Sequence, residues 1–245
     1  YEAFNGSSGI AECHPGFLVA DRRRRILYYR CRILFIAQAL YARHLSSVLL
    51  GRKYRAHHSY LADIIERHKV QNEDEMRELV LIMASSIGSP CNPTKLSNTF
   101  KSVKNVNISN KTISNYLNYL SESFLLNKAI RYDIKGKKYI NTLSKYYFSD
   151  IGLRNAILDM RQQEETHIME NIIYNELITR GYSVDIGMVE IKKQDKNGKW
   201  GRIQLEVDFI ASLGSKKYYV QSALSIPDRE KEIQESRSLM SIDDS

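Results

Sequence analysis

The strongest constraint on the fold is a pair of predicted β-strands near the end of the sequence. Leu205–Ala211 and Lys217–Leu224 are both rich in β-branched and aromatic residues, and Gly214-Ser215-Lys216 separates them as a turn. Because side chains alternate between the two faces of a strand, Glu206 and Asp208 share one face of the first strand. The pattern predicts a hairpin with carboxylates near the end of one strand.

A third carboxylate and an amide complete a candidate site around this hairpin. The segment Met169–Leu177 has the apolar spacing of a helix and carries Glu170, and Gln221 lies on the second strand. Magnesium is commonly held by one or two carboxylates together with waters and substrate phosphates. Glu170, Asp208 and Gln221 are therefore candidate catalytic residues, with Asp208 and Glu170 as candidate ligands of Mg²⁺. The alternative is an ordinary hairpin in which Asp208 caps or pairs locally.

This order of groups resembles the PD-(D/E)xK nuclease fold. In that fold a helix acid is followed by a strand acid, and the next strand carries Glu or Gln two residues before a lysine. The resemblance implies that Glu170, Asp208 and Gln221 stand at the first three positions, whereas Ala223 stands where the lysine is expected. The lysine of active relatives helps to orient the attacking water and offsets phosphate charge. The resemblance thus implies a nuclease-like fold in which cleavage activity is weakened or lost.

The composition is that of a globular protein, and its positive charge favours a polyanionic partner. The 245 residues suffice for one large or two small domains, and 43% are hydrophobic and 26% charged. The formal net charge of +8 favours DNA or another polyanion as the partner. Cys13, Cys31 and Cys91 are odd in number and lack the spacing of metal ligands, which is typical of a protein of the reducing cytoplasm.

The first 70 residues are expected to form a helical linker region. Arg22–Leu50 begins with consecutive arginines and continues as a largely apolar segment, which predicts a partly amphipathic helix with its arginines on a solvated face. Arg43 and His44 interrupt the apolar segment, so no membrane span of about 20 residues is expected. The segment also begins too late for a signal peptide. A polybasic helix that touches a membrane surface is the alternative.

Two local signals predict a pair of helices in the middle of the chain. Asn72 has Glu75 three residues later, which predicts a capping box at the start of a helix over Glu73–Ser86. Asn92–Phe100 is expected to be a short helix, because Pro93 falls in its first turn. The apolar face of the first helix consists of Met76, Leu79, Val80 and Met83.

A third helix and a basic hairpin are expected to follow. Ser109 is a good N-cap, and Asn110–Leu126 has helical spacing. A hairpin is expected to turn at Lys135–Lys137, where glycine lies between two lysines. The next elements are expected to be a strand that begins at Tyr146–Phe148 and a helix over Ile151–Met160. The buried face of the third helix is expected to consist of Ile113, Leu117, Leu120 and Phe124.

Three helices followed by a basic hairpin is the order of a winged-helix DNA reader, in which the third helix enters the major groove. Basic residues of the wing neutralise phosphates, and asparagines of the third helix reach base edges. The alternative is that the same module only packs against a neighbouring protein. The candidate nucleic-acid-binding residues are Lys111, Thr112, Asn115, Asn118, Arg131, Lys135, Lys137 and Lys138.

Several short sequence segments resemble those of one protein family, and together they extend from about Leu61 to the end of the chain. They are Asp63–Lys69, Asn92–Asn98, Thr112–Leu117, Arg131–Lys137, Tyr147–Ala156 and Glu206–Phe209. The chain resembles the C-terminal half (domain of unknown function 4143) of bacterial and archaeal AAA-type ATP-binding proteins. The resemblance implies a winged helix followed by a nuclease-like domain, behind an ATPase domain. This chain has no phosphate-binding loop, so no ATP site is expected in it.

The expected fold is mixed α+β. It consists of the helical region 1–70, a winged-helix domain over 71–160, and a restriction-endonuclease-like α/β domain over 161–245 that is expected to be incomplete at its C-terminus. The expected function is that of the cytoplasmic, non-ATPase C-terminal portion of an AAA-type ATP-binding protein. This portion is expected to be a DNA-binding accessory module with a degenerate nuclease-like domain that does not act as an enzyme, and a partner ATPase or self-association is expected with it. The alternatives are a metal-dependent nuclease and a protein-interaction module without a nucleic-acid partner.

Overall fold

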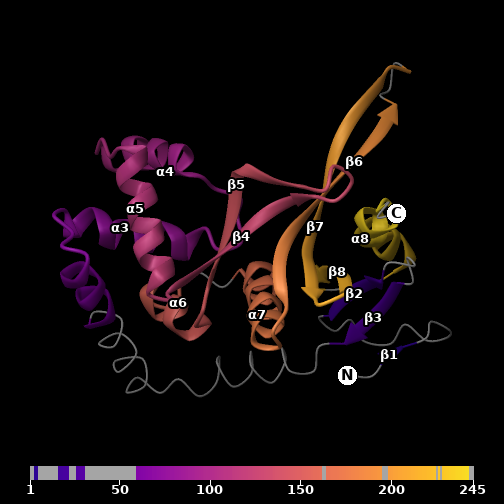
Figure 1. Ribbon diagram of the computed structural model, residues 1–245, viewed down its shortest axis with the longest axis horizontal. Coiled ribbons are helices and arrows are strands. Elements are labelled where there is room, and N and C mark those ends of the chain that lie inside the picture. Colours follow the sequence, from indigo (N-terminus) through magenta and orange to yellow (C-terminus); the bar gives the residue numbers. More distant parts are fainter. Residues whose placement is uncertain are drawn as a thin grey trace. The chain divides into compact units, whose positions relative to one another are not determined.

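The computed structural model describes residues 3–4, 16–21, 26–30, 59–161, 164–194, 198–224, 226 and 228–242. The chain forms two compact units, and each is treated by itself. We call them the sheet unit (Tyr1–Gln38, Ile130–Asn141 and Ile172–Ser245) and the helix unit (Ala39–Ala129 and Thr142–Asn171). Helices and strands both occur, so the expected mixed α+β class is confirmed (Figure 1).

The helix unit is built from helices that flank a long hairpin. A helical stretch over residues 59–67 comes first, near the end of the region 1–70 that was expected to be helical. The hairpin strands and α7 begin in one unit and end in the other. The labelled elements are α3 (Glu73–Ser85), α4 (Pro93–Thr99), the π-helix η1 (Phe100–Lys104), α5 (Asn110–Glu122), β4 (Leu126–Asp133), β5 (Lys138–Phe148), α6 (Ile151–Ile157) and α7 (Glu165–Thr179).

Local capping explains where these helices begin. The Ser109 hydroxyl accepts a hydrogen bond of 3.0 Å from the Thr112 N–H, which confirms the predicted start of α5. At α4, the side chain of Asn92 accepts from the Lys95 N–H at 2.8 Å. The predicted capping box of α3 is wrong in detail, because the Asn72 side chain donates to the Glu75 carboxylate at 3.2 Å and makes no cap bond to the backbone.

The helix expected to run to Leu126 ends four residues earlier. Its expected inner residues Ile113, Leu117 and Leu120 are buried, but Phe124 is 77% exposed. Phe124 has a φ of 56°, in the left-handed region that ends helices, and its N–H bonds the Ser121 carbonyl. The chain thus leaves the helix before Phe124 can reach the buried face, and β4 begins directly afterwards.

The segment between α3 and α4 pairs with β5. Cys91 and Ser144 exchange two backbone hydrogen bonds of 2.9 and 3.0 Å in an antiparallel bridge. Tyr146 lies two residues after Ser144 along β5, and its carbonyl accepts a hydrogen bond of 3.3 Å from the Gly88 N–H. The strand that was expected to begin at Tyr146 is therefore the end of β5 and no separate element. The resulting order is helix, bridge, helix, helix and hairpin.

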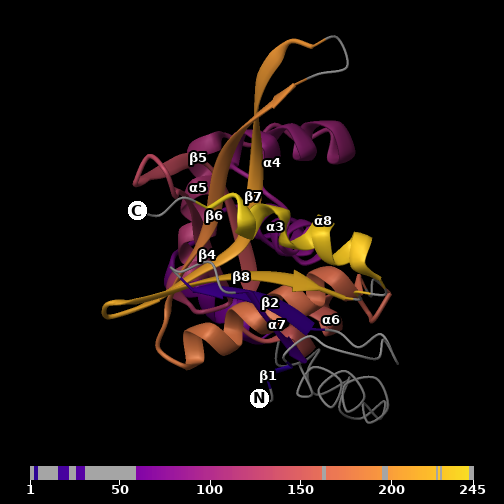
Figure 2. The same cartoon turned by 90° about the vertical axis from the view of Figure 1, so that its right-hand side faces the viewer.

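The sheet unit contains a mixed sheet with helix α8 (Arg229–Met240) packed on it (Figure 2). The strand order is β1-β3-β2-β8-β7-β6-β4-β5, and β4 pairs with β6 in parallel, whereas β6, β7, β8, β2 and β3 pair antiparallel in turn. The remaining strands are β1 (Ala3–Phe4), β2 (Gly16–Asp21), β3 (Ile26–Arg30), β6 (Ser183–Gln194), β7 (Trp200–Leu213) and β8 (Lys216–Ala223).

The N-terminal strands correct the expectation of a helical N-terminal region. Ile26–Arg30 lies within the segment Arg22–Leu50 that was expected to be a helix, but it is strand β3. Its aromatic and branched side chains suit a strand, and β2 lies between it and β8. The rest of the expected helix lies outside the described residues. Strand β6 and helix α8 were not expected at all.

The core of the sheet unit fixes the tip of the β4–β5 hairpin. Ile134, the residue directly after β4, is buried in a cluster with Val189 and Val207 of the central strands, and the cluster also includes Leu239 of α8. The Ile134 N–H donates to the Met188 carbonyl at 3.1 Å. The turn that follows is therefore anchored at its base.

In the described part of the chain, no helix combines the length and the apolar character that crossing a membrane requires.

Candidate functional site

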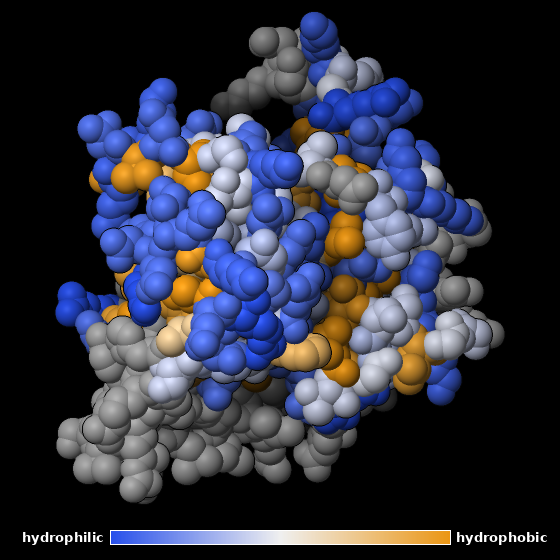
Figure 3. All heavy atoms as spheres, turned by 60° about the vertical axis from the view of Figure 1, so that its left-hand side comes forward, coloured by the Kyte–Doolittle hydropathy of each residue, from blue (hydrophilic) through white to orange (hydrophobic). Residues whose placement is uncertain are grey.

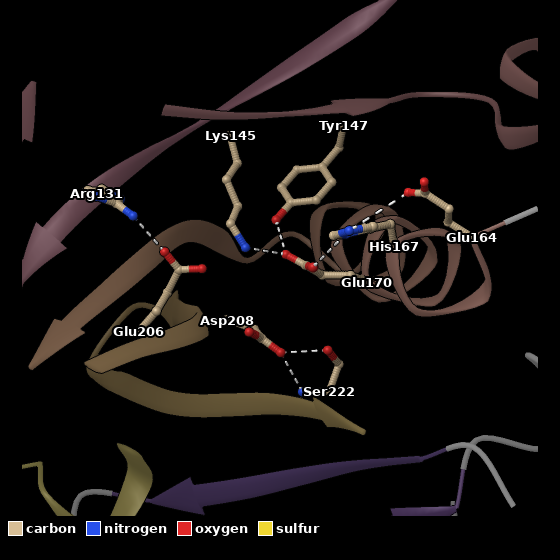
Figure 4. A network of polar contacts seen from close by, with 9 residues as sticks. All are labelled: Arg131, Lys145, Tyr147, Glu164, His167, Glu170, Glu206, Asp208 and Ser222. Atoms are coloured by element: carbon tan, nitrogen blue, oxygen red, sulfur yellow. Dashed lines mark hydrogen bonds and ion pairs between the residues drawn. The ribbon is translucent and has the colours of Figure 1, made fainter. Parts of the chain in front are cut away.

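A buried ion pair in the helix unit joins Lys145 of β5 to Glu170 of α7. The Lys145 ammonium donates to Glu170 Oε1 at 2.7 Å, and the Tyr147 hydroxyl donates to the same oxygen at 2.6 Å (Figure 4). The side chains of Lys145 and Glu170 are only 5% and 7% exposed. A carboxylate is rarely buried so deeply unless it is paired and hydrogen-bonded, and both conditions hold here.

The position of this pair follows from the residues next to it. Strand alternation brings Lys145 and Tyr147 of β5 to the same face. Asn171, which follows Glu170 on α7, donates to the Phe148 carbonyl at 2.8 Å and accepts from the Phe148 N–H at 2.7 Å. This two-point contact sets α7 against β5, so that the carboxylate meets the ammonium and the phenol.

A histidine lies on the other side of the carboxylate. His167 Nδ1 is 3.8 Å from Glu170 Oε2, and His167 Nε2 is 3.8 Å from Glu164, distances of charge–charge contacts rather than hydrogen bonds. Gly88 closes this side, because a Cβ there would lie 3.2 Å from His167 Nδ1. Its φ of +70° also favours glycine at this position.

These neighbours set the ionisation of the site in opposite directions. Burial raises the pKa of Glu170, but His167, Lys145 and Tyr147 together outweigh it and hold that pKa below its usual value. The Glu170 carboxylate raises the pKa of His167, against the lowering effect of burial. The arrangement therefore favours an ionised carboxylate beside a histidine that is more readily protonated than usual.

We expect two pH limits to the stability that this cluster provides. The pKa of Glu170 is lowered from 4.5, so its contribution is present above that value and is lost as the pH falls through the folded-state pKa. The pKa of His167 is raised from 6.5, so its contribution is present below that value and is lost as the pH rises through the folded-state pKa. Urea midpoints measured across this range should lose both slopes in Glu170→Gln. An unchanged pH profile in that variant would contradict the assignment.

The strand acid Asp208 lies in the sheet unit and is 8% exposed. Its Oδ2 accepts hydrogen bonds from the Ser222 N–H at 2.7 Å and from the Ser222 hydroxyl at 2.5 Å. Gln221, expected beside Asp208, uses its Oε1 to accept a hydrogen bond of 3.1 Å from Ser238 of α8. Ser222, the residue next to Gln221, is thus a hydrogen-bond partner of Asp208.

Two further charged side chains of the sheet unit, Arg131 and Asp133, have hydrogen-bond partners. Arg131 of β4 donates to the Glu206 carboxylate at 2.8 Å, and both side chains are partly buried. At the hairpin turn, the Gly136 N–H donates to Asp133 at 2.9 Å. Arg131, a candidate phosphate ligand from the sequence, therefore has a carboxylate partner, whereas the candidate lysines of the turn, Lys135, Lys137 and Lys138, are exposed.

The candidate residues of the third helix lie on its outer side. Lys111, Asn115 and Asn118 of α5 are exposed, and Thr112 is half-buried. The Thr112 hydroxyl lies 2.8 Å from the Ser109 hydroxyl, so it belongs to the cap of the helix. The outer face of α5 thus offers one ammonium and two amides, with the acidic Glu122 four residues after Asn118 at the end of the helix.

The three proposed catalytic residues are divided between the two units. Glu170 belongs to the helix unit, whereas Asp208 and Gln221 belong to the sheet unit. That Glu170 and Asp208 lie close together stays a prediction. Among the described residues, no group of three or more His, Cys, Asp or Glu side chains is arranged to hold a metal ion. The donor set around Glu170 does not fit resident Mg²⁺, because an ammonium occupies the side of the carboxylate that a divalent cation needs.

Sequence reasoning did not find Lys145, Tyr147 and His167. A signal was available in the run Leu143–Phe148, where a single lysine interrupts an apolar and aromatic strand at the same parity as a tyrosine. His167 lies three residues before Glu170, which places both on one side of a helix. A charged residue in an otherwise buried strand requires a buried partner, and a helix acid is the obvious candidate.

Comparisons with known proteins give relatives without an assigned function. An uncharacterized protein of Haemophilus influenzae is 38% identical over 172 residues, which cover 70% of this chain and 40% of that protein. An uncharacterized protein of Methanocaldococcus jannaschii is 27% identical over 173 residues, which cover 71% and 36%. The chain thus spans about two fifths of the length of these curated relatives. No solved structure matches it. A family model described as "Domain of unknown function (DUF8612)" matches residues 41–164.

These comparisons correct the resemblance to the C-terminal halves of AAA-type ATP-binding proteins. The family model that matches is not domain of unknown function 4143, and both relatives are named only as uncharacterized. The segments that carried the resemblance are short, and they combine helix caps and turn residues with ordinary helix and strand interiors. Such segments reflect local backbone needs that unrelated families share, so they do not identify a family.

Proposed function

We propose that this chain, which belongs to the DUF8612 family of unknown function, binds duplex DNA through a winged-helix element whose reading helix, α5, lies in the helix unit. We further propose that the part from α7 onward is a nuclease-like fold without robust cleavage activity. The observation that carries the first proposal is the basic and amide-rich exposed surface of α4, η1 and α5, where the single acidic residue is Glu122 at the end of α5.

The order of elements supports the winged-helix assignment. Helix α3, the Cys91–Ser144 bridge, helices α4 and α5, and the β4–β5 hairpin follow one another along the chain. The short bridge strand pairs with the second strand of the hairpin, which ties the helices to the wing. Because winged-helix readers place their third helix in the major groove, α5 is the element that we assign to base contact.

The charge distribution supports a polyanionic partner for the same surface. From Leu79 to Ser121 the sequence contains four lysines and neither Asp nor Glu. Lys101 and Lys111 are exposed, and Lys104 pairs with Glu78 of α3 at 3.1 Å. Figure 3 shows mainly hydrophilic side chains on the face that carries α4 and α5. Lysines that contact phosphates, combined with amides that can reach base edges, are the groups that DNA readers use.

The chain order from α7 onward supports the nuclease-like assignment. Helix α7 is followed by the antiparallel strands β6, β7 and β8 and then by helix α8. In chain order, a helix acid, Glu170, precedes a strand acid, Asp208, as it does in the PD-(D/E)xK fold, and buried Ala223 stands where that fold has its lysine. A fold that keeps the acids but lacks this cation suits a module that contacts DNA without cutting it efficiently.

Duplex binding is expected to be weak and sensitive to salt. Each phosphate contact that is lost should flatten the slope of log K against log salt by about 0.9. Lys111→Ala should therefore weaken binding of a labelled duplex, measured by fluorescence anisotropy, and the triple variant Lys135→Ala, Lys137→Ala, Lys138→Ala should flatten the slope further. Lys216→Ala, which removes an exposed lysine at the start of β8, is the matched control. Equal affinities and slopes for all these proteins would show that neither α5 nor the turn contacts phosphate. A chain that binds no duplex at all would instead favour a protein-interaction module.

A further inference from the structure

Strands β6 and β7 continue beyond the packed sheet as a two-stranded ribbon (Figures 1 and 2). The register is unbroken from Gly187↔Val207 to Gln194↔Trp200. Buried residues end at Val189 on β6, and from Glu190 onward the side chains of β6 are exposed or half-buried. The outer segment therefore makes no core of its own, and its side chains are available to a partner.

One face of this ribbon concentrates positive charge. Directly opposite residues point to the same face, so Lys192 and Arg202 form a cross-strand pair of like charge. Such a pair is unfavourable in the free protein, and the Glu190–Arg202 contact at 3.3 Å offsets only part of it, because both groups are largely exposed. An anion bound between the two cations would relieve the repulsion.

The next pair on the same face carries the only tryptophan of the chain. Trp200 lies opposite Gln194, two residues from Arg202 along β7, and is 66% exposed. An open hollow of about 480 Å³ is lined by Lys192, Trp200, Gly201 and Arg202. Two residues along a strand span about 7 Å, so an indole face and a pair of cations lie one short step apart.

We propose that this face of the ribbon binds single-stranded nucleic acid, with a base stacked on Trp200 and the adjoining phosphate between Lys192 and Arg202. Aromatic side chains beside a basic track are the combination that binds single strands without sequence preference. A single strand is favoured over a duplex because an indole needs an exposed base face, and a duplex hides those faces between base pairs. The site lies within the sheet unit and does not depend on duplex binding by α5.

Charge complementarity also argues against an apolar or cationic partner. Among the described residues of the outer ribbon, Lys192, Lys193, Lys199 and Arg202 are opposed by Glu190 alone. The coloured atoms near the top of Figure 3, which belong to the described part of the outer ribbon, are largely hydrophilic. A lone aromatic ring amid cations suits stacking better than it suits a hydrophobic protein interface, whose centre is depleted of charge.

The single tryptophan makes the proposal directly testable in the full chain. Titration with oligothymidylate of about 12 nucleotides, within the range of single-strand sites, should quench Trp200 fluorescence to saturation. The apparent affinity should fall with salt, with a slope of about −0.7 for each phosphate contact. Lys192→Ala should raise the concentration needed for half-maximal quenching. A blunt duplex of the same length should leave the fluorescence unchanged.

Variants separate this site from the α5 surface. Measured by anisotropy of labelled oligothymidylate, Trp200→Ala should bind roughly 5- to 150-fold more weakly, the factor that corresponds to one stacked base. Trp200→Phe should retain most of the affinity, and Phe124→Ala, which removes another exposed aromatic ring, should bind like the parent. Lys111→Ala should weaken duplex binding and leave Trp200 quenching intact, so each proposal can fail alone.

Three results would overturn the proposal. The first is equal affinity of Trp200→Ala and the parent for oligothymidylate. The second is quenching by the duplex at the same concentrations as by the single strand. The third is a change of Trp200 fluorescence with anionic phospholipid vesicles but none with oligothymidylate, which would assign the face to a membrane surface instead.

Discussion

Lys145→Met is expected to lower the free energy of unfolding by about 3–5 kcal/mol, the cost of leaving one member of a buried ion pair without its partner. The substitution keeps the length and apolar contacts of the side chain but removes the ammonium that lies 2.7 Å from Glu170. The Tyr147 hydroxyl would remain as a neutral donor to the carboxylate. Urea unfolding followed by far-UV circular dichroism measures the loss.

Two further variants make this result specific to the buried pair. Lys145→Met combined with Glu170→Gln should recover much of the lost stability, because no unpaired charge then stays buried, and Gln still accepts from Tyr147. Lys104→Met removes the lysine of the more exposed Lys104–Glu78 pair and should cost no more than about 1 kcal/mol. If Lys145→Met behaves like Lys104→Met, the Lys145–Glu170 contact does not exist in solution.

Local signals predicted the middle of the chain well. Ser109 and Thr112 lie within one helical turn, so the sequence alone contains both partners of the cap that starts α5. Gly136 lies in the expected hairpin turn, where its N–H donates a hydrogen bond to the Asp133 carboxylate three residues earlier. Both interactions are local, and their stabilising effect does not depend on where the rest of the chain lies.

Structure that depends on contacts between distant segments of the sequence was not predictable from local signals. Ile26–Arg30 offers its aromatic and branched residues to either a helix or a strand, and the pairing with β2, which is set from outside the segment, decides for the strand. Phe124 fits the helical spacing but falls after the point where the backbone turns left-handed. In each case the periodicity was compatible with both outcomes and the tertiary context selected one.

At the candidate site, too, the sequence identified individual residues but did not identify their partners from distant parts of the chain. The sequence identified Glu170 and Asp208 as unusual acids, and both are buried. Their partners come from positions that are distant in sequence: Lys145 and Tyr147 lie on β5, and Ser222 lies on β8. A carboxylate pattern predicts that partners exist, but whether a metal, a lysine or a serine fills that role depends on packing. Which partner binds the carboxylate decides whether the site can hold a catalytic metal ion.

We expect no robust cleavage of supercoiled plasmid DNA by the full chain with Mg²⁺ or Mn²⁺. A nuclease of this type needs carboxylate oxygens that can hold a divalent cation and a lysine that meets developing negative charge. Glu170 Oε1 accepts from both Lys145 and Tyr147, so a metal would have to displace an ammonium in a buried site. Asp208 Oδ2 accepts two hydrogen bonds from Ser222.

The lysine position adds a second obstacle to cleavage. Ala223 at the end of β8 is buried and cannot orient water or offset phosphate charge. Losing one preorganised stabilising group commonly costs about 10²–10³ in rate, before any cost of displacing Lys145 from Glu170. Gel assays of nicking over a range of Mg²⁺ and Mn²⁺ concentrations should show equal, background rates for the parent and for Asp208→Ala. Metal-dependent nicking that is present in the parent and absent in Asp208→Ala would reverse the assignment and make the chain a nuclease, with Lys145 as the first residue to test for the role of the missing lysine.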